Sequence, residues 1–418
     1  MDKRTFLKSA GLLGLAAPLG YLQSAVAAVE GADVRDVARD EDFWAAVRGD
    51  YKLKPDYINL ENGYYCFLPQ QTLERQIEHL RRVNYEGSWY MRNERMATKK
   101  KVAARVGEVV GLSADEVAIT RNATESLDLI IGGIHWEPGD EAVMAEQDYG
   151  TMVAHFEFVA RRFGIVNRVV SVPNHPRDDQ ELVDLYASAM TDKTRLLMIS
   201  HMINITGQVL PVRKICDMAH ARGVEVLVDG AHAYSHIDFQ MADLDCDYYG
   251  SSLHKWLSAP LGSGMLYVRK QKIDSIWPLL AGGKAEPDDI HRLNHLGTDP
   301  VHVDLGILDA LDYQNAIGLE RKEARLKFLQ NYWTSQLRGR PRVLVNTPAD
   351  MHRHGGIGNV GIEGIEPKTL AATLLKDFGI FTVSIDRPGV QGLRITPNLY
   401  TTTDELDALV AAITALSA

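Results

Sequence analysis

Seven short apolar or β-branched segments between about residues 115 and 270 constrain the fold most strongly, because helix-length connections separate most of them. The segments are 116–120, 141–145, 168–172, 195–200, 225–229, 247–251 and 264–268. Strands joined by helices pair in parallel, and a parallel sheet is covered on both faces. The pattern therefore predicts an α/β fold, with a seven-stranded, mostly parallel sheet between helices in a large domain.

Beyond residue 300 the pattern changes to long helices and short strands. Helical spacing predicts one helix over 301–317 and a second from 319 towards 339, with strands near 343–346, 359–362, 381–385 and 393–396. The division expected is an export signal at 1–28, an N-terminal segment at 29–70 and a large domain at 71–300. A connecting helix at 301–318 and a small C-terminal α/β domain at 319–418 complete it.

Composition excludes several classes of protein. The 418 residues include 45 basic and 55 acidic side chains, a net charge of −10, which argues against nucleic-acid binding by a broad basic face. Three cysteines are too few for a disulfide framework. No uninterrupted apolar run of about 18 residues occurs, so stable membrane insertion is not expected.

The first 28 residues have the pattern of an export signal. A basic start with Lys3, Arg4 and Lys8 precedes a mild apolar stretch at 10–22, and 25–27 has the A-x-A pattern of a cleavage site. Residues 3–8 resemble a twin-arginine signal in which Lys3 replaces the first arginine, and the general secretory route remains an alternative. We expect a periplasmic or otherwise exported protein, cleaved near Ala27 and Ala28.

Polar residues collect where the predicted strands end, which is where open α/β sheets bind ligands. Asp229 ends an apolar strand, Asn204 follows another, and Lys255 follows a third. Singly, each has an ordinary explanation as a turn residue or a surface lysine. Together with a helix start at 122–124 that suits an anion, they supply an amine, an acid and phosphate donors. A Schiff-base cofactor needs those parts.

Segments 229–232 (Asp-Gly-Ala-His) and 252–256 (Ser-Leu-His-Lys-Trp) resemble the signature of class V aminotransferases, fold-type I enzymes that use pyridoxal 5'-phosphate (PLP). The isopenicillin N epimerase-like branch is the most similar. The resemblance runs from about Tyr57 to the C-terminus and implies a homodimer with shared active sites.

The resemblance implies specific roles. Lys255 would form the Schiff base and move the α-proton, and Asp229 would pair with the pyridine nitrogen. Arg394 would hold the substrate carboxylate. The other residues implied to contact the cofactor are Ala123, Thr124, Ser252 and His254 at the phosphate, Thr298 at the neighbouring subunit's phosphate, Tyr149 on the ring face, and Asn204 and His232 near the phenolic oxygen. Asn62 is a further candidate for substrate binding.

The family supports transamination, epimerisation and β-lyase chemistry, and few residues separate these outcomes. Transamination of an amino-acid group on a peptide or natural product, such as a siderophore, is the activity expected for an exported member. The family's cysteine desulfurases use a nucleophilic cysteine in the C-terminal part, whereas residues 247–418 contain none.

The sequence leaves two other kinds of function open. His232 and His236 are four residues apart near Asp229, and His352 and His354 form another pair, which would suit a metal-dependent hydrolase. The other reading is a catalytically inactive binding protein, against which the presence of both a lysine and an arginine at the expected positions argues.

Overall fold

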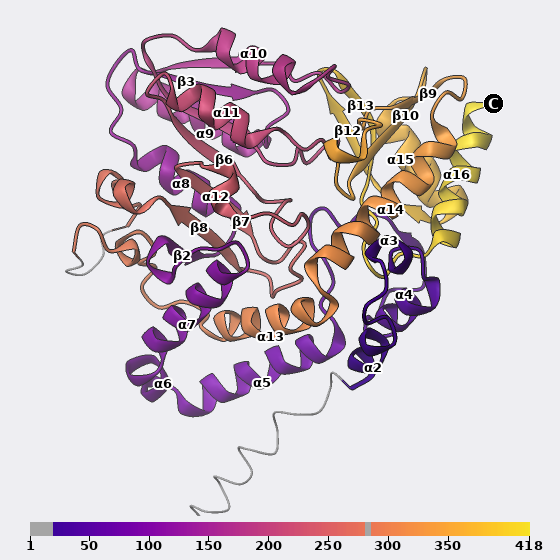
Figure 1. Cartoon of the computed structure of the whole chain (residues 1–418), viewed down its shortest axis with the longest axis horizontal. Helices are drawn as coiled ribbons and strands as arrows, with labels where there is room; N and C mark the ends of the chain where they lie inside the picture. The colour runs from indigo at the N-terminus through magenta and orange to yellow at the C-terminus, as the bar shows by residue number, and fades with distance from the viewer. Residues whose placement is uncertain (1–19, 281–285) are drawn as a thin grey trace, which may run out of the picture.

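The computed structural model describes residues 20–280 and 286–418 and shows two α/β domains side by side (Figure 1). The large domain holds a seven-stranded sheet in the order β2-β8-β7-β6-β5-β3-β4. Its strands are β2 (Val117–Thr120), β3 (Glu141–Ala145), β4 (Val166–Val170), β5 (Thr194–Ser200), β6 (Glu225–Asp229), β7 (Tyr248–Ser252) and β8 (Gly264–Val268). Only the two pairs that include β8 are antiparallel, so the predicted sheet is confirmed. β4 starts two residues earlier than expected because Val166 pairs with Glu141.

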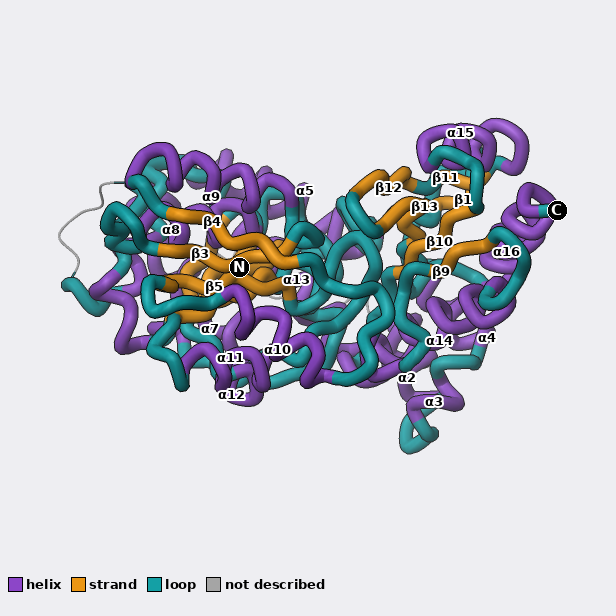
Figure 2. The backbone as a smooth tube through the Cα atoms, turned by 90° about the horizontal axis from the view of Figure 1, so that it is seen from above, coloured by secondary structure: helices purple, strands orange, loops and turns teal. Residues whose placement is uncertain are grey.

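Helices cover both faces of this sheet, as alternation along its strands requires. On β5, Leu196 and Met198 join the apolar cluster of α8 (Ala123–Gly133) and α9 (Gly150–Phe163). Leu197 and Ile199 join the cluster of α7 (Arg95–Glu108), α10 (Asp179–Ala189) and α11 (Val212–His220) on the opposite face. Figure 2 shows these two helical layers with the strands between them. The β5 residues Leu196, Leu197, Met198 and Ile199 are therefore fully buried.

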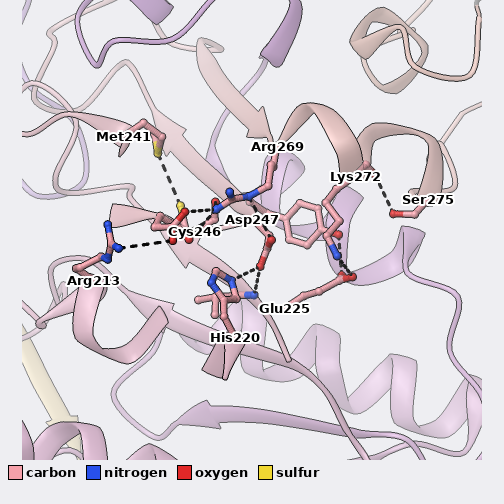
Figure 3. Close-up of polar contacts among 12 residues, drawn as sticks. Arg213, His220, Glu225, Met241, Cys246, Asp247, Arg269, Lys272 and Ser275 are labelled. Carbon is pink, nitrogen blue, oxygen red and sulfur yellow. Dashed lines mark hydrogen bonds and ion pairs between the residues drawn. The ribbon is translucent and has the colours of Figure 1, made fainter. Parts of the chain in front are cut away.

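The amino ends of the central strands carry a network of charged pairs (Figure 3). Glu225, the first residue of β6, accepts hydrogen bonds from Lys272 Nζ at 2.7 Å and the Tyr248 hydroxyl at 2.8 Å. Asp247 accepts from the Val226 amide at 2.9 Å and lies 2.8 Å from His220 Nε2. These acids are paired within the protein, whereas Asp229 stands at the opposite end of β6, where the ligand site is expected.

The small domain contains the antiparallel sheet β12-β13-β10-β9. Its elements are α14 (Leu319–Leu337), β9 (Val343–Val345), β10 (Gly358–Ile362), α15 (Pro367–Phe378), β11 (Ile380–Phe381), β12 (Val383–Arg387), β13 (Val390–Ile395) and α16 (Thr403–Ser417). The strand expected at 381–385 is two strands, since β11 pairs with a different partner from β12. The helix expected at 301–317 is α13 (His302–Ile317).

The N-terminal segment packs against the small domain. Its elements are α2 (Gly20–Ala28), α3 (Val34–Val37), α4 (Glu41–Arg48) and β1 (Ile58–Asn59), and β1 pairs in parallel with β11. The basic residues Lys3 and Arg4 of the expected export signal lie outside the described residues, whereas its 25–27 cleavage pattern lies in α2. The remaining helices are α5 (Gln70–Glu86), α6 (Ser88–Asn93) and α12 (Met241–Leu244). No helix in the described ranges is both long and apolar enough to cross a bilayer.

Candidate active site

A cavity of about 330 Å³ lies at the carboxyl ends of β5, β6 and β7, between the two domains. In the sheet register Asp229 is level with Ser200 and Gly250, so the strands deliver their last residues to one edge. The predicted site residues that line it are Ala123, Thr124, Tyr149, Asn204, Asp229, His232, Ser252, His254, Lys255 and Arg394. The fold therefore brings together ten predicted residues that are spread over positions 123–394.

Lys255 faces a histidine whose tautomer the structure fixes. The Trp256 indole N–H, which can only donate, points at His232 Nδ1 at 3.2 Å. Burial lowers the pKa of His232 well below its usual value, so the ring is neutral and carries its proton on Nε2. That nitrogen lies 3.0 Å from Lys255 Nζ. Because the Nε2–H of His232 is a donor, it can bond to Lys255 Nζ only if that nitrogen has a free lone pair. This contact therefore favours the uncharged form of Lys255.

Burial acts on Lys255 in the same direction and lowers its pKa to about 8, although Asp229 opposes the shift. Asp229 is itself buried, which raises its pKa, and Lys255 partly reverses that rise. One carboxylate oxygen accepts from the Ala231 amide at 3.0 Å. A buried carboxylate of this kind stabilises a cation placed against it, such as a protonated pyridine nitrogen.

The start of α8 forms an anion cradle with the end of β7. Asn122 caps the helix by accepting from the Glu125 amide at 2.8 Å, and Ser252 Oγ accepts from the Ala123 amide at 2.9 Å. The Thr124 hydroxyl has no partner in the part of the chain that the structure describes. β8 approaches so closely that a Cβ on Gly264 would lie 2.6 Å from the Asn122 backbone. Amides and hydroxyls at a helix start suit a phosphate group.

His254 lies beside this cradle, and burial lowers its pKa to about 4. Its Nδ1 is 3.2 Å from the Ser263 carbonyl oxygen and must donate to it, which leaves Nε2 as an acceptor in the neutral ring. A phosphate dianion in the cradle would favour protonation of this nitrogen. The donor set as a whole fits PLP: a free amine, a buried acid and a phosphate cradle converge on one cavity.

Arg394 already has a carboxylate partner. Its Nη2 and Nε bind the two oxygens of Glu61 at 2.5 and 3.3 Å, and Nη1 donates to the Asn204 carbonyl at 3.4 Å. The guanidinium rests on Gly63, where a Cβ would lie 2.8 Å from Cζ. Glu61 therefore occupies one edge of the guanidinium, and one N–H on each of Nη1 and Nη2 is left for a further carboxylate.

Two of the residues expected at the site lie outside the cavity lining. Asn62 is fully buried and its amide is used internally: Nδ2 donates to the Thr396 carbonyl at 2.7 Å, and Oδ1 accepts from the Tyr400 hydroxyl at 2.7 Å. These bonds join the N-terminal segment to the small domain, and contact of Asn62 with substrate stays a prediction. Thr298 lies outside its own chain's cavity, and its role at a partner's phosphate stays a prediction.

Sequence reasoning missed the roles of Glu61 and Trp256. Trp256 directly follows Lys255 in the sequence, so it was expected near the lysine, but the sequence does not show that its indole points at His232. Glu61 lies 333 residues from Arg394, and no local pattern links them.

The model of the family described as "Aminotransferase class-V" matches residues 67–409. The chain belongs to the class-V aminotransferase family. Among curated proteins in the comparison, isopenicillin N epimerase of Streptomyces clavuligerus is 28% identical over 391 residues, covering 90% of this chain and 98% of that protein. A match of this extent leaves no large part of either chain unaligned.

Solved structures share the class-V fold. An apo cysteine desulfurase from Thermococcus onnurineus NA1 superimposes with a TM-score of 0.78 at 21% identity, covering 90% of this chain and 98% of that one. A C-DES variant with glycine covalently linked to its PLP cofactor gives 0.76 at 22% identity, covering 85% and 96%. The fold-type I architecture expected from the resemblance is confirmed.

The metal hypothesis lacks a ligand set in this class-V chain. Within residues 20–280 and 286–418, no three histidine, cysteine, aspartate or glutamate side chains gather as a metal site. His236 Nε2 instead accepts from the Gly356 amide at 2.7 Å, and His354 Nδ1 lies 2.9 Å from the Gly355 carbonyl. His236 thus binds the segment just before β10 of the small domain, and His354 belongs to that segment.

Proposed function

We propose that this chain is a PLP-dependent enzyme that transaminates an amino-acid group carried on a peptide or other natural product. The observation that carries the proposal is Lys255, a half-buried amine with a pKa of about 8 whose Nζ lies 3.0 Å from His232 Nε2 and is stabilised in its charged form by the Asp229 carboxylate. When bound, PLP supplies an aldehyde that condenses with amines and a ring that withdraws electrons from the substrate's Cα.

The chain's residues divide the remaining work. Lys255 would hold the aldehyde and would move the proton at the substrate's Cα. Asp229 would hold the pyridine nitrogen protonated, and Ala123, Thr124 and Ser252 would hold the phosphate. The two free N–H groups of Arg394 orient the substrate carboxylate.

The proton-accepting side chains that line the cavity favour transamination. Transamination returns the proton on the side from which it was taken, so one base is enough. Among the basic side chains that line the cavity, Lys255 is the one able to take and return the proton. His232 is held by the Trp256 indole, and His254 is held by the Ser263 carbonyl. Inversion at Cα needs a second proton donor on the other face, for which the cavity offers the hydroxyls of Tyr64 and Tyr149.

The test is the visible spectrum of purified protein before and after L-glutamate and a small amino-acid panel, with mass spectrometry of the products. We expect a PLP-type band, its conversion to a pyridoxamine-type spectrum, and a 2-oxo acid product. Lys255→Ala should abolish turnover. A protein that stays colourless when incubated with PLP would refute the proposal.

Epimerisation is the second candidate, favoured by the full-length similarity to isopenicillin N epimerase. Chiral chromatography of the same mixtures distinguishes the two. Loss of enantiomeric purity with an unchanged resting spectrum, and its suppression by Tyr149→Phe or Tyr64→Phe, would select the epimerase.

A persulfide-based desulfurase is disfavoured although structural neighbours include desulfurases. All three cysteines are buried, and burial raises the pKa of Cys66, the one adjoining the site, to about 12. A thiol held in its neutral form is a poor nucleophile.

We also propose that the enzyme is exported and acts as a homodimer. The basic start and the 25–27 cleavage pattern support export, and N-terminal sequencing of protein from a periplasmic fraction tests it. Exposed Leu73, Ile77 and Leu80 on α5 support an apolar contact between copies. Shared sites predict that mixing Lys255→Ala with Thr298→Glu chains restores activity that neither variant has alone.

A further inference from the structure

A second cavity of about 330 Å³ adjoins the active site. The loop from β3 to α9, residues 146–150, forms one wall and β12 residues 384–387 form the other. Tyr149 and Asn204 line both cavities. A molecule whose reacting group lies beside Lys255 can therefore continue past these two side chains into the second space.

One face of the β12–β13 hairpin spans both cavities. Arg394 is paired with Val383 across the antiparallel ladder, so their side chains share a face. Arg387 lies four residues further along β12, on that same face by the two-residue alternation. At roughly 3.4 Å per residue, about 14 Å of strand separates the two arginine backbones.

Arg387 differs from Arg394 in having no counter-ion within residues 20–280 and 286–418. It forms no hydrogen bond or ion pair with any residue in the described part of the chain, and its side chain is exposed. Its guanidinium lies over the start of α9, with Nη2 2.8 Å from where a Cβ on Gly150 would be. The hairpin tip is nevertheless anchored, because Asn174 Nδ2 donates to the Gly389 carbonyl at 2.8 Å.

Three acidic residues line this cavity with Arg387, and none of them lies within ion-pair distance of its guanidinium. Asp148 accepts from Ser200 and from the Ala145 amide, both at 2.8 Å, and Asp386 accepts from Gln391 at 3.0 Å. Glu146 is exposed at the rim without a partner among the described side chains. Among the described residues that line the cavity, Arg387 is thus the one cation, and its guanidinium has no ion-pair partner there.

We propose that Arg387 is a specificity residue in a subsite that binds a carboxylate on the distal part of the substrate. The proposal rests on the proposed function, since Arg394 takes the carboxylate next to the reacting amine. That carboxylate must be free, so the link to the distal part runs through the side chain of the reacting residue. The substrate class is an amino acid joined through its side chain to a larger, carboxylated molecule.

The probe is a matched pair of compounds, γ-L-glutamylglycylglycine and its C-terminal carboxamide, which differ only in the distal anion. We expect the acid to have a KM about fivefold or more below that of the amide, the scale of a partly exposed charged hydrogen bond. Calorimetric binding to the PLP-loaded Lys255→Ala variant should show the same preference without turnover.

Arg387→Gln should remove the preference for the acid and leave kcat for free L-glutamate unchanged. Lys376→Gln, an exposed cation of the same domain, controls for net charge and should keep the preference. Thermal melts verify that both variants fold. Equal KM and binding for acid and amide in the wild type, or a preference that survives Arg387→Gln, would overturn the subsite. Failure of L-glutamate and the whole amino-acid panel to change the spectrum would instead count against the proposed function.

Discussion

At the scale of single residues, the site depends on how three neighbours set the charge of one amine. Burial lowers the pKa of Lys255, Asp229 raises it, and the Nε2–H of His232 favours the neutral form. Trp256 controls the last effect because its indole decides which imidazole nitrogen is protonated. One of the three effects on the lysine thus depends on a residue that does not line the cavity.

The lowered pKa gives a pH prediction. Apoprotein captures PLP through the free amine, so the capture rate should rise with pH and reach half its maximum near pH 8, whereas an unshifted lysine would require about 10.5. Stopped-flow absorbance across a pH series measures this. A midpoint at or above 10 would contradict the burial argument.

Replacing Trp256 with Phe removes the donor to His232 Nδ1 while keeping an aromatic ring against His236. We expect the capture midpoint to move upwards, because His232 can then present an acceptor to a charged Lys255. Loss of one buried hydrogen bond should also cost about 0.5–1.5 kcal/mol of stability. Trp44→Phe is the matched control: its indole donates to the Val37 carbonyl at 2.7 Å, so stability should fall without any change in the midpoint.

At the scale of elements, the phosphate cradle is a junction between a helix start and two strand ends. α8 supplies its amides, β7 supplies Ser252, and β8 packs against the Asn122 cap through Gly264. The contact at Gly264 is with backbone, which cannot rotate away as a side chain can.

Gly264→Ala should therefore distort the cradle. We expect a stability loss of about 1–3 kcal/mol from overpacking, together with weaker PLP affinity. Gly132→Ala is the control. Gly132 lies in α8, the helix that supplies the cradle, and a Cβ there makes only an ordinary 3.6 Å contact with His155 Nε2. This change should leave the stability unaltered or raise it by up to about 1 kcal/mol. Urea unfolding and spectral titration with PLP measure both, and unchanged affinity in Gly264→Ala would contradict the packing argument.

At the scale of the whole molecule, the N-terminal segment ties the chain's two ends together. Arg325 of α14 is fully buried and binds both oxygens of Glu41 at 2.6 and 3.2 Å, as well as the carbonyls of Ala38 and Thr401. Arg48 binds Glu405 of α16 at 2.8 Å. These bridges hold the segment that positions Glu61 and Gly63 against Arg394.

Glu41→Gln leaves the buried Arg325 charge with carbonyl partners alone. Breaking a buried pair costs up to about 3–5 kcal/mol, and because Glu41 is 41% exposed we expect about 1–3 kcal/mol. Asp217→Asn, in the exposed pair with Arg213, should change stability by less than about 0.5 kcal/mol. Urea midpoints compare the two, and equal effects would show that burial of Arg325 is unimportant.

The sequence by itself determined the large sheet and most of the cavity lining. Apolar segments of strand length and their helical connections are local patterns, and side chains at strand ends are brought to one edge by parallel pairing. For that reason the sequence was enough to predict Lys255, Asp229 and the helix start at 122–124 as parts of the site. The boundaries of β4 and the separation of β11 from β12 could not be predicted from sequence, because pairing partners decide where a strand begins.

Only the tertiary structure decided what surrounds these residues. The Glu61–Arg394 pair joins positions 333 residues apart, and the internal bonds of Asn62 depend on Thr396 and Tyr400. Arg387 and the loop at residues 146–150 opposite it likewise come from distant parts of the chain. Charge pairing and tautomers follow distances of a few ångströms between distant segments, whereas local patterns report only what neighbours along the chain do.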